Sequence, residues 1–71
     1  MYDVQINALL KDLTRAGKSL DAAKLHLRAA LAAPREQRSR HLAEALPFAH
    51  NAVEVTALAT DQIARGADQN R

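Results

Sequence analysis

The chain has 71 residues, no cysteine and a net charge of +2. The lack of cysteine excludes disulfides and thiolate metal clusters, and the small net charge is unlike that of a nucleic-acid-binding tail. The first residues do not form a basic region followed by an apolar run, and no stretch reaches the roughly 20 apolar residues that cross a bilayer. We therefore expect one soluble cytoplasmic domain without a membrane partner.

The apolar content of the chain consists largely of small side chains. Hydrophobic residues make up 48% of the sequence, but sixteen of the 71 residues are alanine. A short chain buries a small fraction of its surface, and alanine adds little to the hydrophobic stabilisation of a core. We therefore expect a single copy to need self-association or a permanent partner. The abundance of alanine, arginine and leucine is typical of a GC-rich bacterial or phage genome.

The first predicted helix begins near Tyr2 or Asp3 and extends to Ala30. Within it, apolar residues recur at alternating steps of four and three, which is the heptad spacing of packed helices. Gly17 and Ser19 allow an alternative in which one helix ends and another starts. Because the spacing continues unchanged through Gly17, we favour a single helix, in which this glycine lets a neighbouring helix approach closely.

Pro34 marks a turn, because the residue before a proline disfavours the helical conformation. A turn this short predicts that a second helix packs antiparallel to the first. The apolar residues of this second helix keep the heptad spacing from Leu42 to Ile63. Pro47 lies inside it and removes a backbone donor, so we predict one kinked helix rather than two separate ones. We expect a single hairpin domain over residues 1–66 and a flexible tail over 67–71.

Folding the chain at Pro34 sets Leu20 opposite Ala49, so that a large side chain meets a small one. Two hairpins would fill each other's gaps, and the predicted fold is therefore all-α: an antiparallel two-helix hairpin that pairs as a homodimeric four-helix bundle. In architecture only, this resembles the plasmid RNA-binding helical hairpins; no stretch of sequence matches them. The alternative is a monomer, or an array of three or four shorter helices. The predicted dimer core comprises Ile6, Leu9, Leu13, Leu20, Leu27, Leu42, Leu46, Val53 and Ile63.

Three apolar residues of the second helix lie off its heptad positions and are candidates for binding a second protein: Phe48, Val55 and Leu58. Phe48 is the only phenylalanine and follows Pro47, so it is either a docking side chain or is buried in the dimer or against the kinked backbone. Long helical faces suit recognition of another protein. The sequence therefore favours a non-enzymatic adaptor, inhibitor or assembly factor. A structural subunit that assembles further is a weaker alternative.

The second function class is a regulator that binds RNA or DNA. Lys11, Arg15 and Lys18 form a basic stripe on the first helix, and Arg35, Arg38 and Arg40 cluster at the turn. Such side chains contact phosphates, but a solvated face with intramolecular ion pairs explains them equally well. In the antiparallel register, the expected pairs are Arg15 with Glu54 and Lys24 with Glu44.

The histidines do not predict a metal site. His41 and His50 are nine residues apart and fall on opposite sides of a helix, and no Glu-x-x-His pair is present. His26 approaches His41 across the hairpin, but two imidazoles without a third ligand bind a metal weakly. No nucleophile and base form a recognisable motif, and a thin hairpin has no room for a water-excluding pocket. We therefore expect no metal, no cofactor, no small-molecule substrate and no enzymatic activity.

Overall fold

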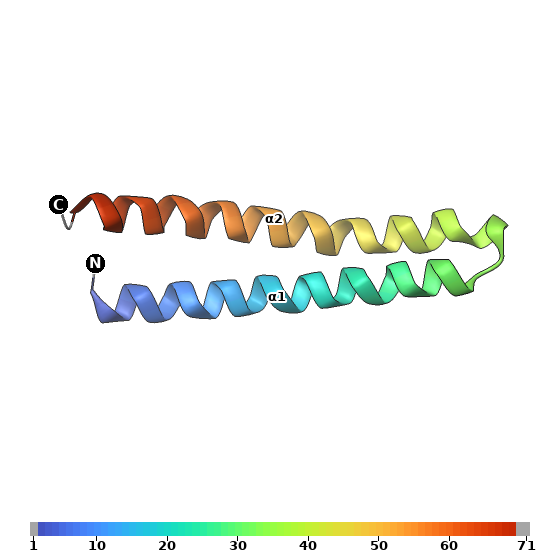
Figure 1. Cartoon of the computed structure of the whole chain (residues 1–71), viewed down its shortest axis with the longest axis horizontal. Helices are drawn as coiled ribbons and strands as arrows, with labels where there is room; N and C mark the ends of the chain where they lie inside the picture. Colours follow the sequence, from blue (N-terminus) through green and yellow to red (C-terminus); the bar gives the residue numbers. More distant parts are fainter. Residues whose placement is uncertain (1, 70–71) are drawn as a thin grey trace.

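Two long antiparallel helices lie side by side in the computed structural model, which describes residues 2–69 (Figure 1). Helix α1 spans Asp3–Ala32 and helix α2 spans Arg38–Gln69, with a short 3-10 turn, η1, at Arg35–Gln37 between them. The start of α1 and the end of α2 lie at the same end of the hairpin (Figure 1). The predicted all-α class and the antiparallel hairpin are confirmed.

The ends of α1 follow from local chemistry. At its start, the Tyr2 backbone N–H donates to Oε1 of Gln5 at 2.9 Å, and the Asp3 carboxylate lies in the first turn, where the helix dipole favours a negative charge. At its end, Ala33 adopts an extended conformation, as expected of a residue before proline. The Gln37 N–H then donates to the Pro34 carbonyl at 2.9 Å, which closes the turn.

Both helices continue through the residues at which the sequence allows a break or a kink. Helix α1 runs through Gly17 and Ser19, and α2 runs through Pro47. Among the described residues, apart from the chain neighbours of Gly17 and the adjacent backbone of α1, no atom lies within 4 Å of the position that a Cβ atom would take at Gly17. Helix α2 of the same chain therefore does not use the space at Gly17, and close approach by a helix of a second copy stays a prediction.

Helix α2 also continues past Gly66, where the predicted domain ends and where a glycine could cap the helix. Gly66 does not adopt the left-handed conformation that ends many helices, and α2 extends to Gln69. The part of the predicted tail at 67–69 is thus helical, and residues 70–71 lie outside the described residues. Gly66 is itself buried, seven residues beyond the buried Ala59, which explains its small size better than capping does.

The interior of the hairpin is formed almost entirely by alanine. On each helix the buried alanines are seven residues apart, and we call these two sets the alanine rows: Ala16, Ala23 and Ala30 of α1, and Ala45, Ala52 and Ala59 of α2. Because alanine side chains are short, the two backbones approach closely and bury little apolar area. No large side chain among the described residues is fully buried. The buried hydrophobic residues are Leu9, Ala16, Ala23 and Ala30 of α1 and Ala45, Ala52 and Ala59 of α2.

The large residues at the predicted heptad positions of the second helix lie beside the closest contact with α1 rather than within it. The sequence placed the contact through Leu42, Leu46 and Val53, but these residues are 51%, 56% and 67% exposed, and the contact runs through the alanine row instead. Two apolar stripes overlap on α2, and the stripe of smaller residues allows the helices to pack closer. Of the predicted dimer core, Leu9 alone is buried within one chain.

The hairpin is a rod of 54 × 16 × 13 Å with a radius of gyration of 16.3 Å. A compact protein of this length has a radius of gyration of about 11 Å. Its accessible surface is 5707 Å², whereas a compact monomer of this mass exposes about 4,300 Å². One chain therefore leaves about 1,400 Å² more surface in solvent than a compact fold would. Among the described residues, no helix combines the length and apolar character needed to cross a membrane.

Candidate functional site

One face of the hairpin carries large apolar side chains that a single chain leaves half exposed. We call it the open face. Its members are between 38% and 67% exposed, and they are eight of the nine residues predicted for the dimer core. The open face is formed by Ile6, Leu13, Leu20 and Leu27 of α1 and by Leu42, Leu46, Val53 and Ile63 of α2.

Shallow grooves run between the two helices along the open face. The largest has a volume of about 530 Å³ and is lined by Leu20 of α1 and by Val53 and Thr56 of α2, among others. A second groove of about 260 Å³ lies nearer the turn and includes Leu27 and Leu42. The largest groove lies in the middle of the hairpin, where the sequence sets a leucine opposite smaller residues.

The open face carries almost no charge. Of the residues that line its grooves, Arg38 alone has a charged side chain, and it lies at the end near the turn. An uncharged apolar surface of this length is unusual for a monomer that acts alone, because exposed apolar patches of a few hundred Å² or more mark interaction sites. The open face therefore has the chemistry of a buried interface.

The residues predicted to bind a second protein lie away from the open face. Phe48 is 38% exposed, and its ring stacks on His26 with a centroid separation of 5.5 Å and an interplanar angle of 15°. The His26 ring therefore covers part of the Phe48 side chain. Val55, seven residues on, is half buried, and Leu58 is 67% exposed. These three residues form an apolar surface that is smaller and less continuous than the open face.

The basic stripe of α1 lies in solvent. Lys11, Arg15 and Lys18 line a depression of about 420 Å³ together with Leu10 and Thr14. In the part of the chain that the structure describes, none of the three basic side chains forms an ion pair.

The acidic partners that the sequence suggested are engaged elsewhere or lie apart. The predicted pairs Arg15–Glu54 and Lys24–Glu44 do not form within residues 2–69. Glu44 instead approaches His26 and Arg40. The turn arginines Arg35 and Arg38 are exposed, and neither forms an ion pair there.

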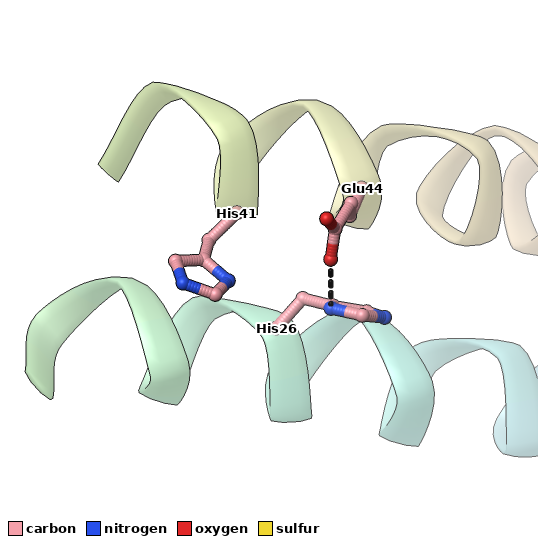
Figure 2. Close-up of side chains that lie close together, drawn as sticks. All are labelled: His26, His41 and Glu44. Carbon is pink, nitrogen blue, oxygen red and sulfur yellow. Dashed lines mark ion pairs between the residues drawn. The ribbon is translucent and has the colours of Figure 1, made fainter. Parts of the chain in front are cut away.

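The structure brings His26, His41 and Glu44 together near the turn (Figure 2). The lack of a Glu-x-x-His pair predicts that no carboxylate lies beside the histidines, and this prediction is wrong. The segment His41-Leu42-Ala43-Glu44 has the reverse order, and residues three apart share a helix face in either order. His50 does not join this group and lines a groove with Leu46 and Val53.

Comparisons with known proteins add no information on function. No protein-family model, curated protein or solved structure matches the chain.

Proposed function

We propose that this protein is a non-enzymatic interaction module that works as a homodimeric four-helix bundle, in which the open faces of two copies cover each other. The observation that supports this proposal is the row of half-exposed, uncharged side chains that continues from Ile6 to Leu27 on α1 and from Leu42 to Ile63 on α2. Among the described residues of a single chain, the buried hydrophobic core consists of Leu9 and the alanines of the alanine rows.

A second copy fits the open face better than an unrelated protein does. Each copy offers large residues beside a central groove lined by Ala52 and Thr56, so that two copies related by a two-fold axis present large side chains to small ones. The excess exposed surface of about 1,400 Å² per chain exceeds the roughly 800 Å² that each partner buries in a standard interface. Self-association therefore supplies the missing core.

The partner of the dimer is expected to be another protein. In the bundle, the open faces are buried, and Phe48, Val55 and Leu58 are among the apolar residues that stay available to a partner. An adaptor, inhibitor or assembly factor of this type presents the outer side of its helices for recognition.

The contact between copies can be tested directly by mixing chains labelled with ¹³C and ¹⁵N with unlabelled chains. Isotope-filtered NOE spectra then report contacts between copies alone. We expect intermolecular NOEs among the methyl groups of Leu20, Leu27 and Val53, and none from Leu25, which lies off the open face. Intermolecular NOEs that centre on Leu25 and spare Leu20 would contradict this arrangement.

We also propose that α2 bends at Pro47. Proline has no N–H, so the carbonyl of Ala43 lacks its usual helix partner, and the proline ring crowds that carbonyl. We expect Pro47→Ala to restore the hydrogen bond and to raise the free energy of unfolding by about 1–3 kcal/mol, less the entropy that proline removes from the unfolded chain. Thermal unfolding followed by circular dichroism measures the first effect, and residual dipolar couplings measure the bend. A variant that is no more stable and has an unchanged helix axis would refute the bend.

A second candidate function, binding of RNA or DNA, is favoured by the basic stripe, whose three side chains form no ion pair with any described residue. If it holds, the triple variant Lys11→Gln, Arg15→Gln and Lys18→Gln should lower the slope of log affinity against log salt by about 2 for single-stranded RNA. A parallel variant replaces Arg35, Arg38 and Arg40 at the turn. The control is Arg65→Gln, because Arg65 is paired with Asp61 at 2.9 Å. Equal retention of nucleic acid by all four proteins would exclude this function.

A further inference from the structure

His26, His41 and Glu44 form a compact group of potential metal ligands that bridges the two helices. One ligand atom from each residue lies within 4.8 Å of the other two. His26 belongs to α1, whereas His41 and Glu44 lie on one face of α2, so the group joins α1 to α2 near the turn (Figure 2). It lies apart from the grooves of the open face, and it does not depend on the proposed dimer.

The spacing of these atoms suits a four-coordinate ion. His26 Nδ1 and Glu44 Oε2 are 3.3 Å apart. A tetrahedral zinc ion with bonds of about 2.0–2.2 Å separates its ligand atoms by roughly 3.3–3.6 Å, which matches this pair. The His41 ring must approach by roughly 1.5 Å at most to complete the triangle, a shift that side-chain torsions on a surface helix supply.

A second, independent observation concerns His41. Its Nδ1 atom is buried and has no hydrogen-bond partner among residues 2–69. A buried polar atom without a partner costs about 1–3 kcal/mol, so proteins rarely retain one without a reason. Figure 2 shows a ring nitrogen of His41 on the side of the ring that faces His26 and Glu44. A cation between the three side chains would accept the lone pair of this nitrogen.

The surroundings restrict the His26 ring and leave one oxygen of Glu44 available to a metal. The Phe48 ring stacks on His26 at 5.5 Å, which restricts rotation of the imidazole. Arg40 approaches Oε1 of Glu44 at 3.7 Å, whereas Oε2 is the oxygen that faces His26. The Arg40 side chain is 72% exposed, so its attraction for the carboxylate is weak and leaves the second oxygen available to a metal.

From this geometry we propose that His26, His41 and Glu44 bind a divalent transition-metal ion, with zinc as the first candidate. Two imidazoles and one carboxylate are a set that zinc accepts, with water in the fourth position. The bound ion links α1 to α2 beside the turn. Since the hairpin core is thin, a metal that binds only the folded chain shifts the folding equilibrium toward the folded state.

The experiment is a titration of the metal-free protein with zinc chloride, followed by calorimetry and by thermal unfolding. We expect one zinc ion per chain, a micromolar dissociation constant, and a melting temperature that rises with zinc and falls back on addition of a chelator. Separate variants His26→Gln, His41→Gln and Glu44→Gln should each weaken binding at least about tenfold, because loss of a direct ligand costs no less than loss of a supporting residue. The matched control is His50→Gln, which should bind zinc as the unaltered chain does.

A second measurement on the unaltered chain needs no variant and so does not depend on whether the variants fold. Zinc should shift the imidazole nitrogen resonances of His26 and His41 and leave those of His50 unchanged. No saturation by about 1 mM zinc, or equal shifts at all three histidines, would overturn the proposal. Equal affinity in His41→Gln and His50→Gln would overturn it as well.

Discussion

Replacing Leu20 by glutamate is expected to raise the dissociation constant of the homodimer at least 100-fold. Leu20 is 48% exposed in one chain and lines the largest groove of the open face together with Val53. In the bundle, its side chain is covered by the second copy. A carboxylate at this position must leave water without an opposite charge to meet it, and about 2.7 kcal/mol of that cost already corresponds to 100-fold.

Leu25→Glu is the matched control, because it makes the same chemical change on the same helix. Leu25 is 66% exposed and takes no part in the open face. Sedimentation equilibrium of both variants measures the dissociation constant. We expect the Leu25 variant to associate as the unaltered chain does. If the two variants dissociate alike, or if Leu20→Glu dimerises normally, the open face is not the interface.

The second large effect is expected in the alanine rows. Ala52 is 2% exposed between the helices, and on one side it borders the groove of about 530 Å³ on the open face. Ala52→Leu adds three carbon atoms there and should push α2 away from α1, with a loss of about 1–3 kcal/mol in the free energy of unfolding. Although leucine is the more hydrophobic residue, its volume decides the result.

Ala64→Leu provides the comparison, because Ala64 lies on the same helix and is exposed. A surface substitution of this kind changes stability by less than about 0.5 kcal/mol. Denaturant unfolding of the two variants at one protein concentration gives both values. A stabilised Ala52→Leu protein would mean that the helices are not in close contact along the alanine rows.

The two helices could be predicted from the sequence, but the side by which α2 faces α1 could not. The heptad spacing and Pro34 suffice to predict two antiparallel helices. On α2, however, the stripe through Leu42, Leu46 and Val53 lies beside the row of Ala45, Ala52 and Ala59, and both have the same period. Hydrophobicity favours the leucine stripe, whereas close packing of two backbones favours the alanine row. Only the folded register separates these alternatives.

That register also explains why the histidine cluster could be predicted only in part. The fold of the hairpin predicts that His26 lies near His41. The same register, however, predicts that the Glu44 carboxylate pairs with Lys24. In the structure, Asn51 Nδ2 donates to Ser19 Oγ at 2.7 Å, so Asn51 lies level with Ser19 on this side of the hairpin. Glu44 then lies level with His26. The sequence contains one pattern that indicates this cluster, the His-x-x-Glu order of the second helix. That pattern indicates a metal site only when a third ligand lies opposite it on the other helix.

The mass of the protein in solution over a dilution series, measured by sedimentation equilibrium, tests most directly whether one chain needs a second copy. A chain of 7.7 kDa that needs a second copy should sediment at about 15.4 kDa at micromolar concentration, and its melting temperature should rise with concentration. A mass of 7.7 kDa throughout the series, together with a cooperative and concentration-independent melting transition, would contradict the proposed homodimer. A single hairpin would then be stable with its open face in water.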